Sequence, residues 1–194
     1  MNFTSRQLAL MSMFIALNIA VGGLVQVIKL PVFVDAVGTI LAAVILGLLP
    51  GIVVGVVSFL LTAVLLNPVY VWFIGTQAVI AITVYVAASR FGAFRSWKRA
   101  VALGLVLGVV AGIASAPVIV AVFGGISGSG RDLITAAMMQ TGSQITKAVL
   151  LSGAASEPID KTLQVLAAFF VLQSMPKRLL GQFRNPVLER NGLL

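Results

Sequence analysis

The sequence predicts an all-α integral membrane protein, a bundle of six transmembrane helices with both termini in the cytoplasm. Of the 194 residues, 60% are apolar and only 9% are charged, and the mean hydropathy is +1.12, whereas about 25% of the residues of an ordinary soluble domain are charged. A transmembrane helix needs about 20 apolar residues, so the chain has room for roughly six crossings and for no sizeable domain outside the bilayer. The distribution of positive charge along the chain indicates the orientation.

The net charge and the absence of two residue types exclude several classes of function. The chain has 13 Lys and Arg against 5 Asp and Glu, a net charge of +8, which would suggest nucleic-acid binding in a soluble protein but reports topology in a membrane protein. It has no Cys and no His, and these residues dominate the ligand sets of zinc, haem and iron–sulfur centres. We therefore expect no metal, no cofactor and no nucleic-acid partner.

The first four crossings are expected in two long uncharged runs. Residues 7–28 form the first run; it is longer than the apolar core of a signal peptide, about 7 to 15 residues, so we interpret it as a retained helix. The second run, 36–89, is too long for one helix, and the turn-forming pairs Pro-Gly at 50–51 and Asn-Pro at 67–68 divide it into three. The expected spans are 34–49, 51–66 and 70–89.

The fifth crossing is expected over residues 100–122, between a basic cluster at 90–99 and a glycine-rich stretch at 124–130. That stretch lacks the Lys followed by Ser or Thr of a phosphate-binding loop, so we expect a flexible outer loop there and no nucleotide site. The last clear apolar run, at about 158–175, is the expected sixth crossing.

The amphipathic segment 131–155 decides the number of crossings. If it does not cross, nine positive charges face the cytoplasm and four face outward, which satisfies the positive-inside rule; if it crosses, the C-terminal charges move outside and this bias is lost. We therefore expect six spans, with 131–155 as a partly helical outer loop. The nine charges are Arg6, Arg90, Arg95, Lys98, Arg99, Lys177, Arg178, Arg184 and Arg190, and the four are Lys29, Arg131, Lys147 and Lys161.

Polar side chains gather at the outer face of this expected bundle. Asp160 and Lys161 lie just inside the last span, where an ionisable group is costly unless it is paired or faces a cavity. Ser156, Glu157 and Pro158 have the pattern of a helix start, and Glu157 lies four residues before Lys161, the favoured order for an ion pair. The cluster is therefore open to two interpretations, a structural cap with its ion pair or a ligand-binding group.

Aromatic and amide residues extend this outer cluster, although Trp and Tyr at this depth are also common interfacial anchors. A pocket of this kind binds a small polar organic molecule by stacking and a few directed hydrogen bonds. Without His, a base for nucleophilic catalysis inside the bundle has few candidates, so we expect no catalytic residue and no enzyme activity. The candidate substrate-binding residues are Phe33, Asp35, Asn67, Tyr70, Trp72, Gln77, Gln144, Glu157, Asp160 and Lys161.

Three segments and a pair of alanines carry a resemblance to a known family. These are LPVFVDAVGTI at 30–40, LGLLPG at 46–51 with Gly55, SEPIDKT at 156–162, and Ala16 with Ala20. Together with the length and the six-span layout, they make residues 5–180 resemble the substrate-binding S component of an energy-coupling factor (ECF) vitamin transporter.

The resemblance implies one six-helix substrate-binding domain over residues 1–180, followed by a short basic cytoplasmic tail at 181–194. Such a component resides in the prokaryotic plasma membrane and captures a vitamin or related nutrient at the outer face. It works with a membrane coupling subunit and two cytoplasmic ATPases, which drive toppling of the bundle in the lipid bilayer. The alanines of the first helix pack on the coupling subunit in this family, so Ala16 and Ala20 are the expected partner contacts.

Two other classes of protein remain open, and the substrate does not follow from the sequence. An oligomeric channel or facilitator would associate through glycine stripes such as Gly104, Gly108 and Gly112, which also suit packing inside the bundle. A pore needs polar residues through the full depth of a helix, whereas the middles of these spans are apolar. A scaffold protein would leave Asp160 and Lys161 as structural groups. Thiamine precursors, riboflavin, pantothenate and nucleobase-like compounds all remain open as substrates.

Overall fold

The computed structural model describes residues 3–28, 30–140, 142–183 and 185–194, and within these ranges the chain forms helices and no strands. Among the described residues, four segments are long and apolar enough to span a membrane: Ser5–Val27, Leu48–Leu65, Pro68–Phe91 and Trp97–Phe123. The elements are α1 (Ser5–Val27), α2 (Val37–Ile45), α3 (Leu48–Leu65), the 3-10 helix η1 (Pro68–Phe73), α4 (Ile74–Phe91), α5 (Trp97–Phe123), α6 (Asp132–Gln140), α7 (Ile145–Ser174), α8 (Lys177–Leu180), the 3-10 helix η2 (Gly181–Phe183) and α9 (Pro186–Arg190).

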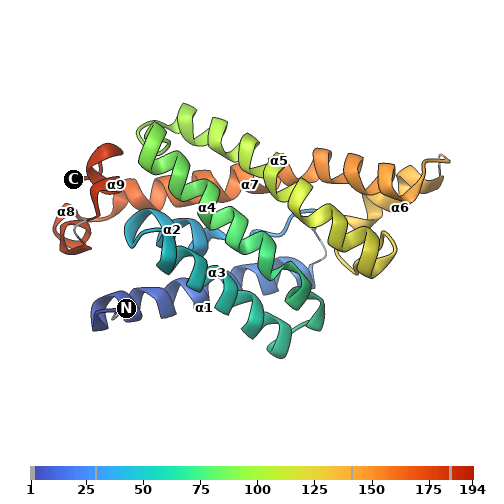
Figure 1. Cartoon of the computed structure of the whole chain (residues 1–194), viewed down its shortest axis with the longest axis horizontal. Coiled ribbons are helices and arrows are strands. Elements are labelled where there is room, and N and C mark those ends of the chain that lie inside the picture. The colour runs from blue at the N-terminus through green and yellow to red at the C-terminus, as the bar shows by residue number, and fades with distance from the viewer. Residues whose placement is uncertain (1–2, 29, 141, 184) are drawn as a thin grey trace.

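The long helices run roughly along the long axis of the molecule, and both termini lie at the same end (Figure 1). The short helix α6 lies at the opposite end, and α5 and α7 pack together along much of their length (Figure 1). Helix α2 is enclosed by α1, α3, α4 and α7. The bundle is therefore arranged around α2.

The second expected crossing is a short core helix. Every residue of α2 is buried, and its nine residues extend only about 14 Å at 1.5 Å per residue. The break expected at 50–51 is wrong, because α2 already ends at Ile45 and Gly47, with φ of +109°, makes the turn. Pro50 lies in the first turn of α3, where the missing N–H has no helical partner to lose. The break at 67–68 is confirmed, since Asn67 caps η1 through the N–H of Val69.

The expected helix start at residues 156–158 is also wrong. Helix α7 begins at Ile145 and continues through Pro158 to Ser174, so the predicted outer segment 131–155 is α6 followed by the first three turns of α7. Pro158 removes one hydrogen bond of the helix. Because α7 does not begin here, the interpretation of Glu157 as part of a helix cap is excluded.

The glycine stripe of α5 faces Pro158 and its neighbours in α7. A Cβ on Gly104 would lie 2.4 Å from Cα of Thr162, and a Cβ on Gly108 would lie 2.4 Å from Cα of Pro158. A Cβ on Gly112 would lie 3.6 Å from Cγ of Glu157. The expectation that this stripe serves internal packing is confirmed, and the close approach of α5 brings its outer half against Glu157.

The described part of the C-terminal segment 181–194 folds back on the bundle. The side-chain amide of Asn185 donates to the carbonyls of Val44 and Ile45, which caps the C-terminal end of α2. Asn191 accepts from the N–H of Phe94 at 2.8 Å, and Val187, Leu188 and Leu193 are buried in the core. This segment therefore secures the end of the bundle at which the termini lie (Figure 1).

Candidate binding pocket

A cavity of about 810 Å³, counted out to its open mouth, lies among α1, α3, η1, α4, α5 and α7. The segment 30–35 and the loop 127–131 complete its lining. The loop 127–131, just before α6, lies toward the end of the molecule away from the termini (Figure 1).

The structure brings most of the predicted binding residues to this cavity. Seven of the ten line it: Phe33, Asp35, Asn67, Tyr70, Gln77, Glu157 and Lys161. Trp72 does not, and its side chain is 54% exposed. Gln144 is exposed at the start of α7, away from the lining. Asp160 is fully buried but does not line the cavity.

Asp160 fixes the strap, the extended segment 30–36 between α1 and α2. Its Oδ1 accepts the N–H groups of Phe33 and Val34, both at 2.9 Å, and its Oδ2 accepts from Lys161 Nζ at 2.6 Å and Gln164 Nε2 at 2.8 Å. Gln164 Oε1 in turn accepts the N–H of Ala36 at 2.8 Å. Both oxygens of Asp160 are thus engaged by the protein, which makes it a positioning residue beneath the cavity.

The strap is strained at Val34. This β-branched residue has φ of +49°, in the left-handed region where such a conformation costs of order 1–3 kcal/mol. The bonds from Asp160 and Gln164 to the strap offset this cost. On the other side, Gly22 of α1 lies so close that a Cβ there would be 2.9 Å from Cβ of Asp35. The strap is therefore fixed between α1 and α7, with Phe33 and Asp35 lining the cavity.

Five buried ionisable residues form a charge cluster beside the cavity. Lys161 Nζ lies 2.6 Å from Asp160 Oδ2, 3.6 Å from Asp35 Oδ1 and 3.8 Å from Glu157 Oε2. Arg131 Nη1 lies 3.0 Å from Glu157 Oε1. The cluster holds three carboxylates and two cations, each residue at most 6% exposed, so its formal charge is −1. Its members are Asp35, Arg131, Glu157, Asp160 and Lys161.

Arg131 was not among the predicted binding residues, although it lines the cavity. It donates to Glu157, to the carbonyl of Val149 at 2.9 Å and to Ser152 Oγ at 3.3 Å. Gly153 leaves room for it, since a Cβ there would lie 2.9 Å from Arg131 Nη2. Burial lowers the pKa of the guanidinium, while the nearby carboxylate of Glu157 opposes this shift. The signal available from sequence was a positive charge directly after the long uncharged run 100–130.

The glycine-rich loop, residues 124–130, is folded over the cavity. The carboxylate of Asp132 accepts the N–H groups of Gly128 and Ser129 and the hydroxyl of Ser127. Ser127, Gly128, Ser129 and Gly130 all line the cavity. Because Asp132 occupies the backbone donors of this turn, the loop serves as a wall of the pocket and holds Arg131 at its end.

A chain of neutral hydrogen bonds, the amide chain Asn18–Thr39–Gln77, approaches the cavity between α1, α2 and α4. Asn18 Oδ1 accepts the N–H of Gly38 at 2.7 Å, which fixes the orientation of this amide. Asn18 Nδ2 therefore donates to Thr39 Oγ1 at 3.0 Å, and the Thr39 hydroxyl donates to Gln77 Oε1 at 2.9 Å. The sequence analysis did not connect Asn18 or Thr39 with the site, because only the packing of three helices brings them into line with Gln77.

Two polar atoms of the cavity wall have no hydrogen-bond partner within the described part of the chain. These are Asp35 Oδ1, an acceptor, and Gln77 Nε2, whose role as a donor is set by the amide chain. Asp35 is 6% exposed and Gln77 is 1% exposed. A buried polar group without a partner is costly, so both atoms are suited to receive a bound molecule.

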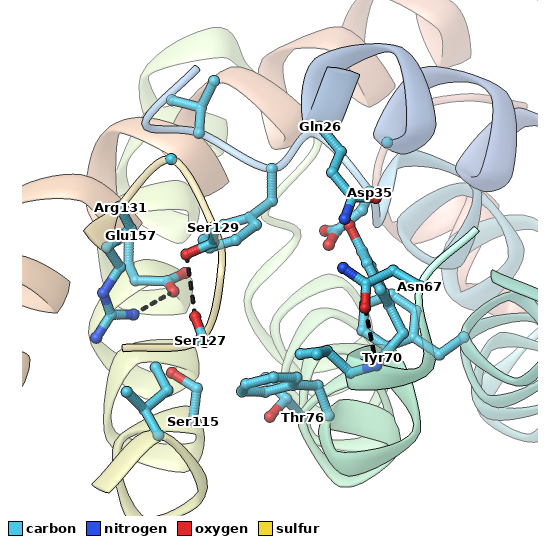
Figure 2. Close-up of a pocket in the computed structure, with 18 of the residues that line it drawn as sticks. Gln26, Asp35, Asn67, Tyr70, Thr76, Ser115, Ser127, Ser129, Arg131 and Glu157 are labelled. Carbon is cyan, nitrogen blue, oxygen red and sulfur yellow. Dashed lines mark hydrogen bonds and ion pairs between the residues drawn. The ribbon is translucent and has the colours of Figure 1, made fainter. Parts of the chain in front are cut away.

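Aromatic side chains contribute to the rest of the wall. Phe59 and Tyr70 pack edge to face with ring centroids 5.0 Å apart, and Phe73 stacks on Phe123 at 6.1 Å. Lys161 Nζ lies 5.7 Å from the ring centroid of Phe33. Figure 2 shows the two walls, with Arg131, Glu157, Ser127 and Ser129 on one side and Asp35, Asn67 and Tyr70 on the other.

The arrangement can bind a small, flat, polar molecule between aromatic surfaces and directed hydrogen-bonding groups. Comparisons with known proteins found no match for this chain among family models, curated proteins or solved structures.

Proposed function

We propose that this protein is the substrate-binding membrane subunit of an ECF-type importer, capturing a vitamin or related small nutrient and delivering it inward with a coupling subunit and two ATPases. The observation that carries the proposal is the cavity itself, whose lining in the described part of the chain includes two buried polar atoms without a hydrogen-bond partner. Its lining offers directed hydrogen-bonding groups and aromatic faces for a solute, and the role we propose is transport without catalysis.

The proposed topology has six crossings: α1, α2 with its strap, α3, η1 with α4, α5 and α7. An even number of crossings agrees with the two termini at one end of the molecule (Figure 1). The turn between α4 and α5 lies at that end too (Figure 1). Arg95 lies in this turn, Arg90 in the last turn of α4, and Lys98 and Arg99 in the first turn of α5. Under the positive-inside rule this end faces the cytoplasm of a prokaryotic cell and the cavity faces outward.

The proposed contact with the coupling subunit is the face of α1 that carries Ala16 and Ala20. Both residues are exposed and lie four apart on one face of the helix. Small side chains on an exposed helix allow another helix to approach closely within the bilayer. The glycine stripe of α5, which an oligomeric channel would use for association, is occupied by packing on α7. The geometry therefore favours the importer subunit over a self-assembled pore.

The proposal is tested by identifying what the protein binds. The full chain is purified in nanodiscs and denatured, and the released small molecules are quantified by mass spectrometry. We expect one nutrient-like molecule per chain from the wild type and none from Thr76→Phe, which fills the cavity from α4. Ile82→Phe on the same helix, where Ile82 is exposed, is the matched control and should retain the molecule. An empty wild-type protein that also fails to associate with an ECF ATPase module would overturn the proposal.

A further inference from the structure

We propose that the molecule bound in this cavity is a planar, positively charged nitrogen compound that donates a hydrogen bond to Asp35 and accepts one from Gln77. The inference rests on the proposed function and deepens it by naming the chemical class of the substrate. Three observations carry it: the charge of the cluster, the two unpartnered atoms and the shape of the walls.

With all three carboxyl groups ionised, the charge cluster carries one more negative charge than its two cations balance. Lys161 and Arg131 face three carboxylates, and all five side chains are shielded from solvent. An uncompensated buried charge is unfavourable. A cation entering the cavity balances the cluster, whereas an anion adds a second unpaired negative charge. The cluster therefore selects a ligand that carries one positive charge.

The open acceptor is located at Asp35. Lys161 Nζ makes its short contact with Asp160 at 2.6 Å and stays 3.6 Å from Asp35 Oδ1, outside hydrogen-bonding range. Asp160 cannot take up the ligand's charge, because both of its oxygens are bound by the protein. An N–H group of a cationic ligand at Asp35 Oδ1 would make the missing bond and pair with the carboxylate.

The open donor is Gln77 Nε2, and it requires an acceptor on the same ligand. The amide chain fixes the direction of this group, since Gln77 Oε1 is occupied by Thr39. A simple aliphatic ammonium group can donate a hydrogen bond to Asp35. It cannot accept one from Gln77 Nε2, because it has no lone pair. A nitrogen heterocycle that bears an amino or amidine group supplies both a charged donor and a ring acceptor.

The walls favour a flat ligand. Phe33, Phe59, Tyr70 and Phe73 line the cavity, and aromatic faces stack on planar rings and attract cations. A planar cation with delocalised charge can both stack on these aromatic faces and be attracted to them electrostatically. The shape of the pocket thus agrees with the chemistry of its two open atoms.

The test uses four aromatic probes of similar size. Benzamidine, benzamide and benzoate carry a positive, a neutral and a negative substituent, and 4-amidinopyridine is benzamidine with a nitrogen atom in the ring. Saturation-transfer NMR titrations measure the Kd of each probe with the full chain in nanodiscs, after removal of bound molecules. We expect 4-amidinopyridine to bind most tightly, followed by benzamidine, then benzamide, with benzoate weakest. A hydrogen bond to a charged group predicts that benzamidine binds about tenfold or more tightly than benzamide.

Two variants assign these preferences to the proposed atoms. Asp35→Asn should remove the preference for benzamidine over benzamide, and Gln77→Leu should remove the gain from the ring nitrogen of 4-amidinopyridine. Gln144→Leu, which changes an exposed glutamine, is the matched control and should keep both preferences. Thermal unfolding of each variant shows whether it is folded. If Asp35→Asn does not fold, the wild-type ranking and the Gln77→Leu comparison still decide the question.

Several results would overturn the inference. Benzamide or benzoate binding as tightly as benzamidine would do so, and so would release of a neutral or anionic nutrient, one per chain, from the denatured protein. In the second case the proposed function stands and only the substrate class is wrong. If no probe binds, the charge of the released molecule decides, with a cation supporting the inference. If nothing is bound or released at all, this inference is wrong, and the proposed function fails as well if the chain also does not associate with an ECF ATPase module.

Discussion

The charge cluster and the amide chain meet the same cavity, but they are built on different principles. In the charge cluster, three carboxylates lie near Lys161, and Asp35 Oδ1 is left without a hydrogen bond within the described chain. In the amide chain, every bond has one direction, set by the backbone N–H of Gly38, and the last donor, Gln77 Nε2, is left open. In both systems the group that faces the cavity, Asp35 Oδ1 or Gln77 Nε2, has no hydrogen-bond partner among the described residues. The groups behind it, such as Asp160 and Asn18, have theirs. The comparison separates residues that position the site from residues that meet a ligand.

The largest expected effect on stability follows from removing the carboxylate of Asp160, whose two oxygens are both hydrogen-bonded within the protein. Asp160→Ala leaves Lys161 and two strap N–H groups without their acceptor. Breaking a buried ion pair by removing one partner destabilises a protein by about 3–5 kcal/mol. We expect a large drop in stability together with loss of ligand binding, measured by thermal unfolding in detergent.

Asp160→Asn is the comparison variant for Asp160→Ala, because its amide oxygen can still accept a hydrogen bond from the strap while the negative charge is removed. An intermediate loss of stability is expected. If Asp160→Ala unfolded like the wild type and lost only ligand affinity, Asp160 would be a ligand contact, and the distinction between positioning and contacting residues would be wrong for this cluster.

A second variant disturbs the charge cluster through packing alone. Gly108→Ala places a Cβ 2.4 Å from Cα of Pro158, beside Glu157. Forcing an extra methyl group into a packed interface costs about 1–3 kcal/mol. We expect a lower unfolding temperature and weaker ligand binding, because α7 must move. Gly75→Ala, with open space around the new atom, should be neutral; equal effects of the two variants would show that the α5–α7 contact does not position the cluster.

The amide chain should respond less strongly than the charge cluster. Asn18→Leu removes the acceptor of the Gly38 N–H and the donor to Thr39, and an unsatisfied buried group costs about 1–3 kcal/mol. The Gln77 amide also loses its fixed orientation, so affinity should fall with stability. Ser58→Ala removes only one of the two acceptors of Asn18 Nδ2 and should have a smaller effect. Unchanged affinity in a folded Asn18→Leu variant would show that Gln77 does not depend on the chain.

The sequence predicted much of the helical layout and most of the cavity lining, but not how these groups are connected. Uncharged runs predicted helices that the structure contains, because hydropathy is a local property. The breaks at residues 50–51 and 156–158 were wrong, because proline is accepted in a first turn and in a helix that a glycine-containing neighbour approaches closely. Those two positions depend on tertiary packing, which a local pattern does not contain.

The predicted site shows the same division. Asp35 and Gln77 were predicted from their position near the outer face, and both line the cavity. Asn18, Thr39 and Arg131 were missed, since their contacts join residues 18 or more apart along the chain. Trp72 was selected as an aromatic residue at the right depth, but its side chain lies outside the lining.

The smallest expected effect on stability belongs to a change that touches neither polar system. Ala16→Leu adds bulk on the exposed face of α1, where a substitution usually changes stability by about 0.5 kcal/mol or less. Ligand binding should be unchanged, but association with a coupling subunit, measured by co-purification with an ECF module, should be lost because the larger side chain prevents close helix contact. Ala102→Leu, at an exposed alanine on α5, is the control and should still associate. Normal association of Ala16→Leu would place the partner surface elsewhere and leave both polar systems, and the site they form, as they are.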